Sequence, residues 1–212
     1  MKLKDWLDRW REGNIGWHQN EGNKGLKQYW PNLPNSSRVL VPLCGKTVDM
    51  AWLNRKGMDV TGVEISATAA KTFFEEQGLE YECLDKDSFT IYRAKSTALT
   101  IYCGNYFEFV SSPFDALYDR ASLIALESTL RPHYIRHTKS LLKHNAKKLV
   151  ITLEYDQRKV DGPPFSVTSH EVNSYWPRLS RIKEAEALDT CPPKFKASGI
   201  TSVTEVLWLD RE

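Results

Sequence analysis

Hydrophobic and polar positions along this chain follow two periods, one typical of helices and the other of strands. The apolar residues 3, 6, 7 and 10 have the i, i+3, i+4, i+7 spacing of one helical face, which predicts a helix over 3–11. Further along, β-rich runs alternate with helical patterns. The predicted strands are 38–41, 59–63, 89–93, 98–103, 114–118 and 148–155. The predicted helices lie near 50–57, 66–78, 134–142 and 169–176.

This alternation predicts a mostly parallel sheet with right-handed crossovers and helices on both faces. Two final β-rich stretches, 179–188 and 202–209, predict an antiparallel addition at one edge. We therefore expect one three-layer α/β domain over residues 1–212, with an N-terminal segment at 1–35 and a core at 36–212. Residues 12–25 are rich in Gly and Asn, and we predict a long loop there, with Trp17 and His18 at its centre.

Composition and charge narrow the class of protein. The 212 residues include 29 Lys plus Arg and 27 Asp plus Glu, a net charge of +2. This balance gives no electrostatic signature of nucleic-acid or membrane binding, and no apolar run reaches the roughly 18 residues of a membrane span. The start lacks the apolar core of a secretory signal, and the cysteines at 44, 83, 103 and 191 lack zinc-ribbon spacing. We expect a cytoplasmic monomer with free thiols and no metal ion.

Candidate chemistry is expected in the loops after the strands, because ligands of such sheets bind beyond the carboxyl ends. Gly45-Lys46-Thr47 follows the first strand, but a P-loop also needs a glycine at position 40, which is Leu40. The G-x-G-x-x-G fingerprint is absent as well. Glu64 ends the second strand 21 residues after Leu43 (64 − 43), where a carboxylate can accept both hydrogen bonds of a ribose diol. The alternative, a surface glutamate without a ligand, stays open from position alone.

Other polar residues have two interpretations each. His133 and His137 are four apart on a predicted helix, a spacing that can bind a metal ion, but without a third ligand we favour a solvent-exposed helix face. His18 either orders its loop or contacts the substrate. Asp119 and Arg120 directly follow the predicted strand 114–118, where they either neutralise each other or face a ligand; we favour the ligand.

A set of rarer motifs resembles the thiopurine S-methyltransferase family. The main motif is VPLCGKTVDMAWL at 41–53, followed by GVEIS at 62–66. Supporting motifs occur in order along the chain: W-x-x-x-W at 6–10, WHQ at 17–19, YDRA at 118–121 and GPPF at 162–165. The resemblance covers about residues 5–209 and indicates a bacterial-type member. It implies a Rossmann-like class I methyltransferase fold with an N-terminal helical lid, a seven-stranded sheet whose last strand is antiparallel, and S-adenosylmethionine as the methyl donor.

The resemblance also implies roles for individual residues. The cofactor-binding residues would be Trp6, Trp10, Leu43, Glu64, Asn105, Tyr106 and Arg120. In this assignment the two tryptophans close over the cofactor, the leucine contacts it, and the glutamate holds its ribose. The asparagine and tyrosine lie at the adenine end, and the arginine reaches either the methionine end or the substrate.

The resemblance implies fewer residues for binding the substrate than for binding the cofactor. Trp17 occupies a substrate-contact position of the family, and Arg120, with Asp119 beside it, would face the substrate. Residues 162–165 would form part of the cover. Lys194 stands where mammalian members have an arginine near the substrate, so a substrate contact at this position is not carried over.

The predicted reaction is methyl transfer from S-adenosylmethionine to the sulfur of a small thiol, such as a thiopurine or another aromatic or heterocyclic thiol, or to a selenium or tellurium compound. Transfer from a sulfonium to a thiolate discharges two opposite charges, which a dry aromatic site favours. An ionised thiol needs no strong base, so we assign no catalytic residue and expect alignment to supply the rate. Two alternatives remain: a non-catalytic S-adenosylmethionine-binding module, and a nucleotide-dependent oxidoreductase, which the missing glycine fingerprint disfavours.

Overall fold

The computed structural model describes residues 3–16 and 18–210. Its strands are β1 (Arg38–Pro42), β2 (Asp59–Glu64), β3 (Tyr81–Lys86), β4 (Phe89–Ala94), β5 (Leu99–Cys103), β6 (Phe114–Arg120), β7 (Leu142–Glu154), β8 (Leu179–Glu186) and β9 (Thr204–Asp210). Its α-helices are α1 (Leu3–Arg11), α2 (Lys24–Tyr29), α3 (Asp49–Arg55), α4 (Ala67–Glu76), α5 (Arg131–Ser140), α6 (Ser169–Tyr175) and α7 (Lys194–Ala197). Short 3-10 turns are η1 (Tyr106–Glu108), η2 (Leu123–Ala125) and η3 (Leu188–Thr190).

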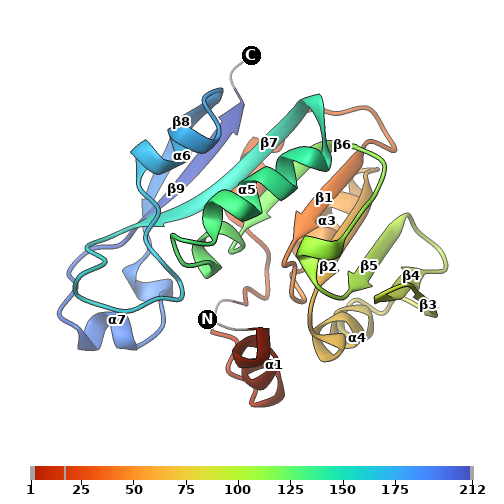
Figure 1. The fold of residues 1–212 in the computed structure, drawn as a ribbon, viewed down its shortest axis with the longest axis horizontal. Helices are drawn as coiled ribbons and strands as arrows, with labels where there is room; N and C mark the ends of the chain where they lie inside the picture. The colour runs from red at the N-terminus through yellow and green to blue at the C-terminus, as the bar shows by residue number, and fades with distance from the viewer. Residues whose placement is uncertain (1–2, 17, 211–212) are drawn as a thin grey trace.

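The strands form one sheet in the order β3-β4-β5-β2-β1-β6-β7-β9-β8 (Figure 1). β5, β2, β1, β6 and β7 are parallel, as predicted. β9 pairs antiparallel with both β7 and β8, which confirms the antiparallel last strand. The predicted count of seven is wrong for the described residues, because the hairpin β3–β4 extends the sheet beyond β5 to nine strands. The residues of β3 are almost all exposed, so no buried alternation marked it in the sequence.

Two core clusters cover the two faces of the sheet, which confirms the three layers. Because side chains along a strand alternate in direction, Val39 and Val41 of β1 pack with α3 and α4, whereas Leu40 packs with α5 and α6. Figure 1 shows α5 in front of the sheet and α3 behind it. None of the helices in the described part of the chain is long and apolar enough to cross a membrane.

The predicted loop at 12–25 is partly wrong, because α2 begins at its end. The side chain of Asn23 caps this helix by accepting a hydrogen bond from the amide of Leu26 at 3.0 Å. Leu26 is fully buried in the core cluster that also contains Leu207. A Cβ at Gly25 would lie 2.3 Å from a Leu207 methyl carbon, so only glycine lets α2 approach β9 this closely. The short helix therefore fastens the N-terminal segment to the sheet.

Candidate active site

The carboxyl ends of β1, β2, β5 and β6 meet at one edge of the sheet, and α1 lies below that edge (Figure 1). The chain crosses from β1 to β2 on one side and reaches β6 on the other, which is the switch point where such folds bind ligands. Hydrogen bonds join the loops here. The amide of Cys44 donates to the carbonyl of Val63 at 3.0 Å, and that of Gly104 donates to the carbonyl of Glu64 at 2.9 Å. The hydroxyl of Ser122 donates to the carbonyl of Pro42 at 2.6 Å.

Two non-glycine residues have left-handed backbone at this edge. Leu43, directly after β1, has φ +44°, and Ala121, directly after β6, has φ +70°. Such conformations cost on the order of 1–3 kcal/mol each, and they concentrate at ligand and active sites. The loop after β1 also packs very closely on β2, since a Cβ at Gly62 would lie 2.6 Å from the sulfur of Cys44. This strained, tightly packed backbone places Leu43 at the switch point, and its contact with the cofactor stays a prediction.

Glu64 is at the centre of this edge and is not a surface residue. Its side chain is only 5% exposed, so the alternative of a surface glutamate without a role is wrong. One carboxylate oxygen accepts from the amide of Gly45 at 2.7 Å, and the other from the amide of Ser66 at 2.9 Å. Burial raises the pKa of this carboxyl group, and the backbone hydrogen bonds oppose that rise. A carboxylate accepts about four hydrogen bonds, so acceptor capacity remains for ligand hydroxyls.

Asn105 and Tyr106 have different environments although they are adjacent. Asn105 follows β5 and caps η1, accepting a hydrogen bond from the amide of Phe107 at 3.2 Å. The side chain of Tyr106 is buried and bonds through its hydroxyl to Thr138 of α5 at 2.9 Å. The side chain of Tyr106 therefore points into the core, whereas Asn105 follows two residues after Cys103, the β5 residue that pairs with Glu64.

The predicted contact between Asp119 and a ligand is wrong. Its side chain is 0% exposed, so it does not face a ligand. One oxygen accepts from the hydroxyl of Tyr134 at 2.7 Å and the other from the amide of Leu123 at 3.2 Å. Burial raises the pKa of Asp119, and these hydrogen bonds lower it. We therefore reassign Asp119 from substrate contact to positioning of the loop that follows Arg120.

Arg120 is held by a buried carboxylate that the sequence analysis missed. One guanidinium nitrogen lies 4.0 Å from Asp49 of α3, which is fully buried. Asp49 also accepts from the hydroxyl of Tyr118 at 2.7 Å and from the amide of Asn23 at 2.7 Å. Burial raises the pKa of Glu205 of β9, whereas the charge of Arg120 lowers it. This network joins the N-terminal segment, α3, β6 and β9.

The sequence carried a signal for Asp49. An acidic residue in the first turn of the helix after β1 is in a position that the helix dipole favours. Its partners, however, come from residues 23 and 118–120, which only the fold brings to it.

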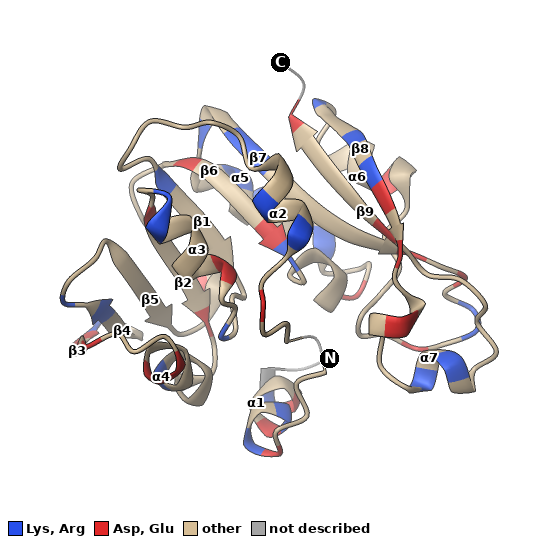
Figure 2. Cartoon of the chain, turned by 180° about the vertical axis from the view of Figure 1, so that it is seen from behind, with Lys and Arg blue, Asp and Glu red and all other residues tan. Residues whose placement is uncertain are grey.

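The N-terminal helix carries both predicted lid tryptophans. Trp10 is 8% exposed, and Trp6 is half-buried with the guanidinium of Arg9 5.9 Å from its ring centroid. Burial lowers the pKa of Lys194 in α7, and the nearby charge of Arg9 lowers it further, so α1 and α7 approach each other. Figure 2 shows basic residues on both helices at this end of the molecule. Trp17 lies outside the described residues, and its contact with substrate stays a prediction.

His18 lies in the same region. Burial lowers its pKa, and the positive charges of Lys46 and Arg120 lower it further, while Glu76 opposes them. The amino group of Lys46 is itself paired with Glu76 at 2.5 Å. His18 is therefore near Arg120, and both roles considered for it remain open.

The remaining candidates are the two histidines of α5 and the segment 162–165. His133 and His137 pack against aromatic residues of η1. The ring centroid of His133 lies 4.6 Å from that of Phe107 with the rings tilted, and the centroid of His137 lies 5.0 Å from that of Tyr106 in an edge-to-face arrangement. Burial lowers the pKa of His137. Within the described residues no three of His, Cys, Asp and Glu group closely enough to hold a metal ion. In the 162–165 segment the amide of Phe165 donates to the carbonyl of Ile124 at 2.6 Å, joining it to the loop after β6.

Known proteins resemble this chain over its whole length. The family model described as thiopurine S-methyltransferase matches residues 1–212. The thiopurine S-methyltransferase of Pseudomonas syringae pv. pisi is 43% identical over 217 residues, which cover 99% of this chain and 98% of the relative. That of Bordetella petrii is 40% identical over 215 residues, covering 98% and 97%.

Solved structures agree at the level of the fold. The 1,6-didemethyltoxoflavin-N1-methyltransferase of Burkholderia thailandensis, with bound S-adenosylhomocysteine, matches with a TM-score of 0.63 at 14% identity, covering 99% of this chain and 87% of that chain. A SAM-dependent methyltransferase of Anabaena variabilis matches with a TM-score of 0.61 at 11% identity, covering 99% and 95%.

The fold is that of the class I methyltransferases, and the family match identifies a methyltransferase that depends on S-adenosylmethionine. Within that class the chain belongs to the thiopurine S-methyltransferase family, which confirms the resemblance seen in the motifs. The family assignment favours an enzyme over the binding module and the oxidoreductase.

The residues at the switch point fit this cofactor. The buried Glu64 has acceptor capacity for a ribose diol. The loop after β1 contains a single glycine, Gly45, whose amide is bonded to Glu64, so it is not available to cradle a pyrophosphate. S-adenosylmethionine has a ribose and no pyrophosphate, so the donor and acceptor groups match it.

Proposed function

We propose that this protein transfers the methyl group of S-adenosylmethionine to the sulfur of a small thiol that reacts as a thiolate. The names of the relatives support sulfur as the acceptor atom. The observation that carries the proposal is the guanidinium of Arg120, which stands at the end of β6 at the carboxyl edge of the sheet. Positive charge beside a thiol favours its ionised form and lowers its pKa, so no protein base is required.

We further propose how the cofactor is held. S-adenosylmethionine supplies a methyl group on a positively charged sulfur. The residues proposed to hold it are Trp6, Trp10, Leu43, Glu64, Asn105, the backbone of Tyr106, and Arg120. The carboxylate accepts hydrogen bonds from the ribose, and the leucine packs against the cofactor from its strained loop. The tryptophans of α1 exclude water, which strengthens the electrostatic interactions inside the site.

The substrate side of the proposal centres on Arg120 and Trp17. The arginine, held by Asp49, orients the thiolate, and the tryptophan contributes an aromatic wall. Asp119 acts indirectly, because it positions the loop after β6. The reaction then depends on alignment of the thiolate with the methyl group, which can supply several kcal/mol.

The test compares kcat/KM for a panel of thiopurines, other aromatic or heterocyclic thiols, and selenium compounds, with the oxygen and amine analogues of the same rings. We expect transfer to the sulfur compounds. Arg120→Met should lower kcat/KM by about tenfold to a hundredfold, the loss of a charged hydrogen bond, and shift its pH profile toward the pKa of the free thiol. Arg120→Lys should retain more activity because it keeps the charge.

The control is Arg93→Met, which removes an exposed arginine of β4 that pairs with the exposed Glu82 at 3.6 Å. It should leave kcat/KM unchanged. Transfer only to the oxygen or amine analogues, or an Arg120→Met enzyme with the wild-type pH profile, would show the proposal to be wrong.

We also propose that the protein acts as a monomer. Among the described residues the large exposed apolar side chains are Leu84, Val110 and Ile182, which come from β3, the loop before β6, and β8, so they do not form one patch. Sedimentation equilibrium of the purified protein tests this, and a dimer mass would contradict it.

A further inference from the structure

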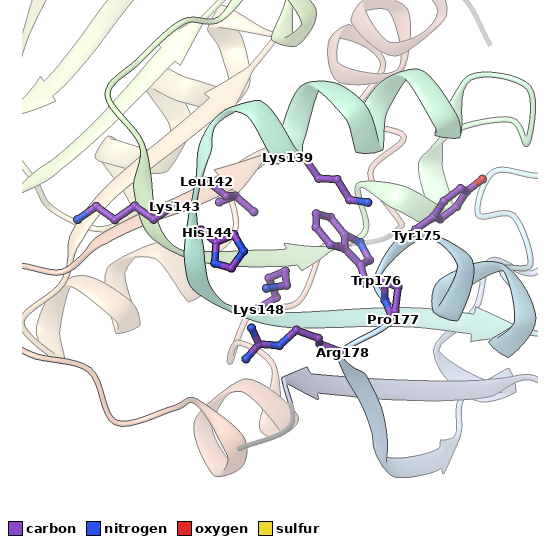
Figure 3. Close-up of a pocket in the computed structure, with 9 residues that line it drawn as sticks. All are labelled: Lys139, Leu142, Lys143, His144, Lys148, Tyr175, Trp176, Pro177 and Arg178. Atoms are coloured by element: carbon purple, nitrogen blue, oxygen red, sulfur yellow. The ribbon is translucent and has the colours of Figure 1, made fainter.

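A cavity lies at the opposite end of the sheet from the candidate active site (Figure 3). Its volume is about 410 Å³, within the range of small-molecule sites. The end of α5, the start of β7 and the residues after α6 line it. β6 runs parallel to β7, from Phe114 opposite Leu142 to Arg120 opposite Ile151. The cavity adjoins the first of these pairs, so it is about 20 Å of strand length from Arg120.

Basic side chains dominate the wall of this cavity, and none of the described residues that line it is acidic. Two of them, Lys143 and Lys148, pair with the carboxylates of Asp115 and Asp210, at 2.6 and 3.0 Å. The other two basic residues, Lys139 and Arg178, are exposed, and neither has an ion pair within the described residues. Because the whole chain has a net charge of only +2, this uncompensated positive charge is a local feature.

An aromatic side chain with an unpaired donor lies among these charges. Trp176 is 6% exposed, and the amino groups of Lys139 and Lys148 lie 5.1 and 5.6 Å from its ring centroid. Its Nε1 is buried without a hydrogen-bond acceptor among the described residues. Buried donors in native proteins nearly always have a partner. This donor therefore favours a ligand that brings an acceptor oxygen, a conclusion that does not depend on the charges. Figure 3 shows the Trp176 ring close to the side chain of Lys139, whereas Tyr175 extends away from it and donates a hydrogen bond from its hydroxyl to Glu171 at 2.9 Å.

We propose that this cavity binds a small aromatic molecule that carries a phosphate group. A phosphate accepts hydrogen bonds from cationic side chains such as Lys139 and the fork of Arg178, and its several oxygens also offer an acceptor to the indole of Trp176. The ring of the ligand packs against the edge of Trp176. Because this site is at the amino end of β7, it is separate from the proposed methyl-transfer site and does not rest on the proposed function.

The experiment is calorimetric titration with phenyl phosphate and, separately, with inorganic phosphate, at low ionic strength and with saturating S-adenosylhomocysteine to occupy the cofactor site. We expect one saturable site, with phenyl phosphate binding more tightly than inorganic phosphate because only the former has a ring. Lys139→Glu and Arg178→Glu should each weaken phenyl phosphate binding about tenfold or more. Both residues are exposed, so these variants should fold.

The matched control is Arg136→Glu, which makes the same reversal of charge on the exposed face of α5 but does not line the cavity. It should change the affinity by less than about twofold. Trp176→Phe keeps an aromatic ring without the N–H, and it should weaken both ligands. No saturable binding of phenyl phosphate, equal losses in the Arg136 and Lys139 variants, or equal affinity for the two ligands would each overturn the proposal.

Discussion

Replacing Glu64 with glutamine tests the proposed cofactor site most directly. The substitution keeps the size of the side chain but removes its charge and exchanges one acceptor oxygen for an NH2 group. In the protein alone, the carboxylate accepts from the amides of Gly45 and Ser66, and the glutamine can retain only one of these bonds. A hydrogen bond to a charged group contributes about 1.5–3 kcal/mol. Because glutamine also avoids the unfavourable burial of a charge that raises the pKa of Glu64, we expect a net destabilisation of less than about 2 kcal/mol.

The effect on cofactor binding should be larger. Donation from ribose hydroxyls to a charged acceptor is lost, and the NH2 group faces those hydroxyls or the backbone amides. The corresponding loss of about 1.5–3 kcal/mol weakens binding of S-adenosylhomocysteine by about tenfold to a hundredfold. Calorimetric titration measures this affinity, and thermal unfolding measures stability in the same samples.

The matched control is Glu75→Gln, the same exchange at an exposed position of α4, which should leave both quantities unchanged. A folded Glu64→Gln protein with wild-type affinity would refute the reasoning. Lower stability with unchanged affinity would have the same consequence, since it would show that Glu64 only holds the loop after β1.

Three further predictions concern pH and the buried carboxylates. Burial raises the pKa of Glu64, and hydroxyl donors of the ribose favour its ionised form, so affinity for S-adenosylhomocysteine should rise as pH rises from the ordinary glutamate range through this raised pKa. Calorimetric titrations over pH should show this rise in affinity, and Glu64→Gln should abolish the pH dependence. The same raised pKa means that the residue's contribution to stability is present below its unfolded pKa and is lost as pH rises through the folded one. Asp49→Asn removes the charge that holds Arg120 and weakens the bond to the amide of Asn23, so kcat/KM should fall about tenfold and protease should cleave the N-terminal segment faster; wild-type values for both would contradict this role. Asp119→Asn should lower the free energy of unfolding by about 1–3 kcal/mol, measured in urea, without changing KM for the thiol by more than about twofold; a large change in KM would restore the substrate contact.

Much of the fold could be predicted because strong local signals agreed with the tertiary structure. The helix at 3–11, the strand ending at Glu64 and the helix beginning near residue 66 were all predicted from local patterns, and all are present. The misses were elements with weak local signals. β3 is exposed on nearly every residue, and α2 has six residues, of which only Leu26 is buried. Such elements are stabilised by pairing and packing with distant parts of the chain.

The site divides in the same way. The alternation of strands and helices predicted that the loops after the parallel strands meet at one edge, and the family resemblance implied Leu43, Glu64, Asn105 and Arg120 as the residues of interest there. The direction of each side chain was decided by tertiary packing. Asp119 precedes Arg120 by one residue, and the alternation of a strand sends the two side chains to opposite faces, the first into the core and the second toward Asp49.

The buried connections were decided by the tertiary structure alone. Asp49 stands three residues after Lys46, and its position in the first turn of a helix is one that a surface acid also takes, so this local signal does not show that it is buried. It acquires its role because the fold brings a backbone amide, a tyrosine hydroxyl and a guanidinium from three distant segments to one carboxylate. Sequence periodicity shows on which face of its own helix or strand a residue lies. The free energy of a buried polar group, however, depends on hydrogen-bond partners that only folding supplies.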